Sequence, residues 1–147
     1  MVYVFTHRLS SPVEVVDFTL ALTAEERTRS RHRYTTEGGA EVYLDLPRGT
    51  VLKGGNHLGA DDHAQVLQVI ARPEAVMTVK AQTEFDLLRA AYHLGNRHVP
   101  LELHPDYLRL SPDPVLAHLL QHLGAQVVYE TVPFEPESGA YGHAHAH

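Results

Sequence analysis

The chain has 147 residues, of which 44% are hydrophobic and 20% charged, so its composition is that of a globular protein with a buried core. Its formal net charge of -6 disfavours nucleic acid as a partner, and no stretch approaches the roughly 20 apolar residues of a membrane span. It has no cysteine, which excludes disulfides, thiolate metal ligands and a cysteine nucleophile. Against only 2 lysines stand 12 histidines, and histidine is the commonest metal-binding side chain. No signal peptide is visible, so we expect a cytoplasmic location.

Residues 1–72 are predicted to form a β-rich domain, with a role in docking a protein or peptide. The apolar and β-branched runs predict strands at residues 2–9, 13–22, 41–46, 51–53 and 64–71, separated by glycine- and proline-containing turns. Many short strands of this kind are typical of a small barrel or sandwich.

Every second residue from 27 to 33 is an arginine. Arg27, Arg29, Arg31 and Arg33 would share one face of a strand, because side chains alternate across a sheet. That face is either a solvated surface or a docking surface for an acidic partner.

Two histidines flank an acidic pair in the first domain. His57 and His63 lie on either side of Asp61 and Asp62. The pattern is compatible with a weak metal site, but a surface loop is the simpler interpretation.

The pattern changes at Arg72, Pro73 and Glu74, which we take as a domain boundary. Strands are predicted at residues 76–82, 99–103, 107–110 and 126–132, and helices at residues 84–94 and 112–123. The resulting order, βαββαβ, is that of a ferredoxin-like domain over residues 73–133. Residues 134–147 follow as a flexible tail that contains histidines. The fold class is therefore α+β.

The first predicted helix ends in a segment with two histidines. Thr83 is placed to cap its N-terminus, and Gly95 is predicted to end it by adopting a left-handed conformation. His93 then lies in the last turn, and His98 lies just beyond, before Pro100. These histidines either cap the helix and fill space or bind a ligand. The residues predicted to form the buried face are Phe85, Leu87, Leu88, Ala91 and Tyr92.

The second predicted helix carries His118 and His122. Histidines four residues apart face the same way and can share a zinc ion. A zinc peptidase of the His-Glu-x-x-His type needs a glutamate where this chain has Leu119, so that chemistry is disfavoured. We interpret both as surface residues, and adventitious metal binding is the alternative. The predicted core stripe comprises Leu116, Leu119, Leu120 and Leu123.

The chain finishes with three alternating histidines. His143, His145 and His147 point to one side of an extended chain and offer several imidazoles to one ion. Imidazole and carboxylate ligands without thiolates suit Ni²⁺, Cu²⁺ or Zn²⁺. The alternative is a purification tag, although the tract is not a plain histidine run.

Three stretches together resemble the UreE family of urease accessory proteins. They are AYHLGNRHVPL at residues 91–101, LPRG at 46–49 with LKGG at 52–55, and PFEPESGAY at 133–141, ahead of the histidine-containing terminus. The likeness spans essentially the whole chain in the same order.

The resemblance implies a nickel metallochaperone for the urease active site rather than an enzyme. It implies an N-terminal β domain, a C-terminal ferredoxin-like domain and a homodimer formed through the C-terminal domains. His98 of each subunit would hold one shared Ni²⁺, a site that also suits Zn²⁺ or Cu²⁺. The tail histidines would complete or feed that site, and His93 is an auxiliary candidate. The implied partners are apo-urease and accessory proteins including the GTPase UreG.

One departure from the family removes a second metal site. Some members carry a His-x-His pair where this chain has Pro112, Asp113 and Pro114, so a site built on that pair is not expected. The competing hypothesis for the whole chain is a protein-docking module whose metal binding is incidental.

Overall fold

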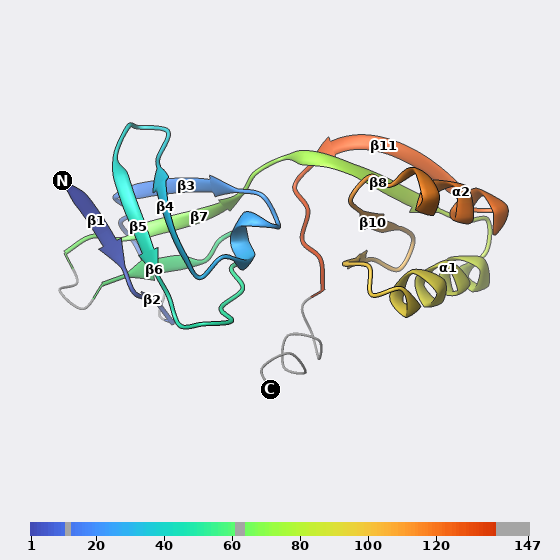
Figure 1. Ribbon diagram of the computed structural model, residues 1–147, viewed down its shortest axis with the longest axis horizontal. Helices are drawn as coiled ribbons and strands as arrows, with labels where there is room; N and C mark the ends of the chain where they lie inside the picture. The colour runs from blue at the N-terminus through green and yellow to red at the C-terminus, as the bar shows by residue number, and fades with distance from the viewer. Residues whose placement is uncertain (11–12, 61–63, 138–147) are drawn as a thin grey trace. The chain divides into compact units, whose positions relative to one another are not determined.

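A computed structural model of the chain describes residues 1–10, 13–60 and 64–137. The chain divides into two compact units, and the division falls between Arg72 and Pro73 (Figure 1). Each unit has a hydrophobic core of its own.

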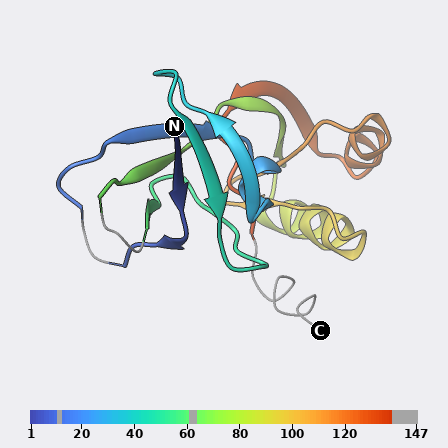
Figure 2. The ribbon, with the colours of Figure 1, turned by 60° about the vertical axis from the view of Figure 1, so that its left-hand side comes forward.

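Unit 1 is almost entirely β. Its strands are β1 (Val2–Phe5), β2 (His7–Arg8), β3 (Phe18–Leu22), β4 (Arg31–Thr35), β5 (Glu41–Asp45), β6 (His57–Gly59) and β7 (Leu67–Ala71), with one turn of 3₁₀ helix at Glu26–Thr28. They form a three-stranded sheet in the order β1-β5-β4 and a four-stranded sheet in the order β2-β6-β7-β3. Figure 2 shows β1, β5 and β4 side by side.

The two sheets of unit 1 enclose one core. Phe5, Val42 and Leu44 from the three-stranded sheet pack with Leu58 and Val69 from the four-stranded sheet, and all five are buried. Both sheets remain open over the described residues, so the closed barrel, one of the two architectures that the sequence predicted, is not formed.

Several predicted strands of unit 1 are wrong in extent. The strand predicted at 2–9 is two strands in different sheets, and only Phe18–Leu22 of the one predicted at 13–22 is extended. Residues 51–53 form no strand, because Leu52 donates its N–H to the carbonyl of Arg27 instead of to a neighbouring strand. Residues 64–66 likewise precede β7 rather than belong to it.

The arginine stripe is also wrong as a single strand face. Arg27 lies in the 3₁₀ helix and is only 2% exposed, with its Nε donating to the Leu22 carbonyl at 3.4 Å. Only Arg31 and Arg33 lie on β4, where they pair with Asp45 at 3.1 Å and with Glu41 at 2.8 Å on β5.

Unit 2 contains both α-helices. Its elements are β8 (Glu74–Lys80), α1 (Glu84–Asn96), β9 (Glu102–Leu103), β10 (Leu108–Leu110), α2 (Pro114–His122) and β11 (Gln126–Val132). The strands form one antiparallel sheet in the order β11-β8-β10-β9. Neither helix has the length and apolar character that crossing a bilayer requires, and this holds for the described residues.

One face of this sheet packs against the two helices. Met77 and Val79 of β8 and Leu108 and Leu110 of β10 share a buried cluster with residues of α1 and α2. Because side chains alternate along a strand, Thr78 and Arg109 lie on the other face. The sheet of unit 2 therefore has an apolar, helix-covered face and a polar face.

Helix α1 starts where the sequence predicts, whereas α2 starts at Pro114, two residues later than predicted, and both helices bury residues that only partly match the predicted ones. The Thr83 side chain accepts from the Asp86 N–H at 3.1 Å, which confirms the predicted N-cap, and Asp113 caps α2. The buried residues of α1 are Leu87, Ala90 and Leu94, and those of α2 are Ala117 and Leu120. The predicted buried face of α1 is wrong at three positions that are about two-thirds exposed, namely Phe85 at 65%, Leu88 at 66% and Tyr92 at 67%.

Candidate metal site

The end of α1 places His98 in a conformation that L-amino acids rarely adopt. The helix does not stop at Gly95 as predicted but continues to Asn96, and His98 has a φ of 60°. The His98 N–H donates to the Gly95 carbonyl at 2.9 Å, and the Val99 N–H donates to the Leu94 carbonyl at 3.2 Å. These two bonds define a Schellman motif with His98 at C′, the position that glycine usually occupies.

Helix α2 ends in the same motif with glycine in that place. Gly124, with φ 86°, donates to the Gln121 carbonyl at 3.0 Å, and Ala125 donates to the Leu120 carbonyl at 2.9 Å. A left-handed conformation costs a non-glycine residue roughly 1–2 kcal/mol. His98 is the one described non-glycine residue with positive φ, so this chain accepts a stability cost to keep an imidazole there.

His98 is exposed and borders an open hollow of about 310 Å³. The hollow lies where the loop after α1 meets the start of α2, and its lining residues are Arg97, His98, Val99, Pro100, Ser111, Pro112, Asp113 and Leu116. It thus includes Pro112 and Asp113, part of the segment where the resemblance places a His-x-His pair in some relatives.

His93 is half-buried in the last turn of α1. Its ring lies edge-on to that of Tyr92 at 5.3 Å, and its carbonyl accepts from Arg97 Nη1 at 2.9 Å. Across the described ranges, no three His, Asp or Glu side chains gather into a metal-binding group. Among the described residues of one chain, His98 is therefore not part of a group of three such side chains.

The other histidines noted in the sequence fall in different places. His118 and His122 are exposed on α2, and His57 lies on β6 rather than in the predicted loop. His63, Asp61 and Asp62 lie outside the described residues, as do the tail histidines His143, His145 and His147.

The segment that leads to the tail is described as far as Glu137. Two backbone groups of this segment bond to residues 101–102: the Glu135 N–H donates to Glu102 Oε1 at 2.7 Å, and the Glu137 N–H donates to the Leu101 carbonyl at 2.7 Å. The last described residue, Glu137, is thus bonded to Leu101, which lies three residues after His98 and directly before β9 in the sequence; Figure 1 shows this segment descending from the end of β11.

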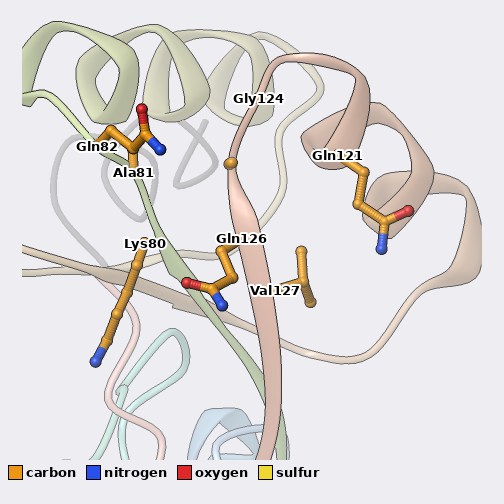
Figure 3. A pocket seen from close by; sticks show the side chains of 8 residues that line it. Lys80, Ala81, Gln82, Gln121, Gly124, Gln126 and Val127 are labelled. Atoms are coloured by element: carbon orange, nitrogen blue, oxygen red, sulfur yellow. The ribbon is translucent and has the colours of Figure 1, made fainter.

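A larger open hollow, of about 510 Å³, lies at the other end of the sheet. Figure 3 shows Lys80, Gln82, Gln121 and Gln126 around it. Its described lining includes none of the candidate histidines, so we do not assign it to the metal site.

A polar cluster around Glu102 was not predicted from the sequence. Glu102, His104, Arg109 and Glu130 come from three strands and one loop, and sheet pairing brings them together. Their spacing along the chain has no periodicity that would have indicated this.

Comparison with known proteins gives consistent matches to one family. A model described as UreE urease accessory protein, N-terminal domain, matches residues 5–71, and the corresponding C-terminal domain model matches residues 74–147. Proteins named urease accessory protein UreE match from Nostoc punctiforme (61% identity, 90% of each chain), from Nostoc sp. strain PCC 7120 (54% identity, 93% of each chain) and from Microcystis aeruginosa (51% identity, 96% of this chain and 93% of the relative). With both domain models matched in order and identities above half over nearly the full length, the chain belongs to the UreE family of urease accessory proteins.

Proposed function

We propose that this chain is a nickel metallochaperone for urease maturation, not an enzyme, and that it acts in the cytoplasm. The observation that carries the proposal is the left-handed His98 at the end of α1, where α2 has glycine. An exposed imidazole that is retained against backbone strain indicates selection for ligation rather than for stability.

The proposed metal site is shared by two subunits. One His98 provides one nitrogen, and a two-fold axis would bring the partner's copy to the same ion. The apolar stripe on α1, formed by Phe85, Leu88 and Tyr92, supports a homodimer through unit 2, because exposed apolar patches commonly mark protein interfaces.

The tail histidines would complete the coordination. Glu137 is bonded to Leu101, and three residues of chain separate Leu101 from His98, a distance of at most about 11 Å. His143 lies six residues after Glu137, and six residues extend to at most about 22 Å. His143 can thus reach the His98 of its own chain, with His145 and His147 beyond it and His93 as an auxiliary candidate.

This arrangement suits a carrier. A tethered ligand binds by effective concentration and leaves without the site being dismantled, which permits both holding and release. Imidazole ligands accept Zn²⁺ and Cu²⁺ as well as Ni²⁺, and Cu²⁺ generally binds more tightly. Nickel as the cargo is inferred from the family's role with urease, as are apo-urease and the GTPase UreG as partners.

We further propose that unit 2 is a ferredoxin-like domain. Its βαββαβ order, antiparallel sheet and single helix-covered face support this assignment. Residues 73–133 would bind metal and dimerise, residues 134–147 would act as the histidine-containing tail, and residues 1–72 would dock partner proteins.

The competing docking-module function, with incidental metal binding, is less well supported. Its main feature was the arginine stripe, which the structure breaks into one buried arginine and exposed arginines that pair within the unit.

The test is a calorimetric nickel titration of the natural chain and of His98→Ala, with the mass in solution measured in parallel. We expect about one ion per dimer for the natural chain and loss of that binding step in a variant that stays dimeric. A variant that binds nickel as well as the natural chain would overturn the His98 site. A His118→Ala/His122→Ala variant serves as the control and should bind normally.

A further inference from the structure

The face of the unit 2 sheet opposite the helices carries a polar cluster that takes no part in the proposed metal site. Strand pairing places Glu102 of β9 opposite Arg109 of β10, and Arg109 opposite Thr78 of β8. Arg109 Nε donates to Thr78 Oγ1 at 3.2 Å, Thr78 also bonds to Glu130, and Arg109 stacks on Tyr107 at 4.7 Å.

Glu102 is the centre of this cluster and is only 8% exposed. Its Oε2 lies 2.5 Å from His104 Nε2 and 3.3 Å from Arg109 Nη1. Its other oxygen, Oε1, accepts from the backbone N–H of Glu135 at 2.7 Å. Arg109 Nη1 and the Glu135 N–H both donate to this carboxyl group, one to each of its oxygens.

The bond to Glu135 joins opposite edges of the sheet. β11 is one edge strand and β9 is the other, and the three spacings between them amount to about 14 Å. β11 ends at Val132, and three residues later the backbone N–H of Glu135 meets the side chain that Glu102 extends from β9; Phe134, next to Glu135, is 2% exposed. Residues 133–137 therefore carry the chain from the β11 edge of the sheet to the β9 edge. β9 is the strand that comes next after His98 in the sequence.

We propose that Glu102 is a positioning residue for metal binding, which holds the start of the histidine-containing tail beside the strand that follows His98. This inference rests on the proposed function, because it assumes that tail histidines contribute ligands at His98. Glu102 does not itself bind the metal. It fixes the point from which the tail extends, and with it the number of residues between that point and the tail histidines.

The expected size of the effect follows from tether length. With the segment in place, six residues separate Glu137 from His143, whereas a released segment leaves eleven, counted from Val132. Effective concentration falls roughly as the −3/2 power of length, so release should weaken the contribution of the tail about 2.5-fold or more.

The metal test compares Glu102→Gln in two backgrounds, the full natural chain and a chain with His143→Ala, His145→Ala and His147→Ala. We expect nickel affinity to fall about 2.5-fold or more in the first background and to stay unchanged in the second. The matched control is Glu130→Gln, because Glu130 also pairs with Arg109, at 3.8 Å, but does not contact Glu135 in the bonds described. It should leave nickel affinity unchanged in both.

Equal weakening in both backgrounds, or none in either, would overturn the positioning role. If the triple tail substitution alone leaves nickel affinity unchanged, the tail histidines are not ligands, and the positioning role of Glu102 fails with them. The His98 site is tested separately by His98→Ala, so its failure can be told apart from failure of the tail.

A second measurement does not depend on metal. In the metal-free chain, Glu102→Gln should increase hydrogen exchange at the amides of Glu135 and Glu137, and Glu130→Gln should not. Glu135→Pro, which removes the N–H donor and leaves the cluster's charges in place, should weaken nickel binding as Glu102→Gln does. Unchanged protection in Glu102→Gln would overturn the proposal.

Discussion

His98 is the residue on which the proposed function depends most, because its backbone conformation has an energetic cost. A histidine at C′ of a Schellman motif holds a left-handed backbone that glycine adopts without penalty. The chain uses glycine at the equivalent position after α2, so the motif does not by itself require histidine. The strain at His98 is therefore best explained by the use of its side chain.

We expect His98→Gly to raise the free energy of unfolding by about 1 kcal/mol while removing nickel binding, because it relieves the left-handed strain. The opposite change, Gly124→Ala, should lower the free energy of unfolding by a similar amount. A Cβ at Gly124 meets no atom within 4 Å, so only the left-handed backbone conformation disfavours the substitution. Urea unfolding of the metal-free proteins at one protein concentration measures both. A destabilised His98→Gly would contradict the strain argument.

Tyr34 gives a pH-dependent prediction. Burial raises the pKa of the Tyr34 phenol above its ordinary value, and the nearby charge of Glu26 raises it further, whereas Arg29 opposes the shift. The folded state therefore holds the proton more tightly than the unfolded state, so this stabilisation is complete below about pH 10 and is lost as pH rises above it.

The natural chain should accordingly lose more unfolding free energy between pH 8 and pH 11 than Tyr34→Phe, which has no phenolic proton. Urea midpoints at the two pH values measure this. Parallel losses in the two proteins would show that Tyr34 does not contribute.

At the scale of elements, the arginine run divides into two environments. Arg27 is buried in a 3₁₀ turn, and Arg33 is an exposed member of β4 that pairs with Glu41. Arg27→Ala should lower the free energy of unfolding by about 3 kcal/mol, because it removes a buried side chain and leaves the Leu22 carbonyl without this donor. Arg33→Ala should cost less than about 1 kcal/mol. Equal costs by urea unfolding would contradict this division.

Helix α1 carries two apolar stripes with the same spacing. Leu87, Ala90 and Leu94 face the sheet, and Phe85, Leu88 and Tyr92 remain exposed. Both sets follow the i, i+3, i+7 rule, so periodicity predicts an amphipathic helix but does not select which stripe is buried. The exposed stripe is the surface available for a second subunit.

At the scale of the whole molecule, the proposed dimer should depend on that stripe. We expect Leu88→Glu to shift the protein from dimer to monomer and to weaken nickel binding, because a charge in an apolar interface is costly and the paired His98 site is lost with it. Sedimentation at matched concentrations, followed by nickel titration, measures the two effects. Val15→Glu, at an exposed apolar position of unit 1, is the control. A dimeric Leu88→Glu variant would place the interface elsewhere.

The sequence by itself determined the family, the α+β class, the element order of the second unit and the N-cap at Thr83, and it singled out His98 as a candidate, because caps, periodicity and motifs are local signals. Tertiary structure alone decided the rest. The left-handed backbone of His98 depends on where α1 ends, and the buried stripe of α1 depends on which side meets the sheet. Glu102 joins Arg109 and Glu135 from distant parts of the chain only because strand order places β9, β10 and the segment after β11 together, and pairing between strands is a non-local property that no spacing in the sequence records.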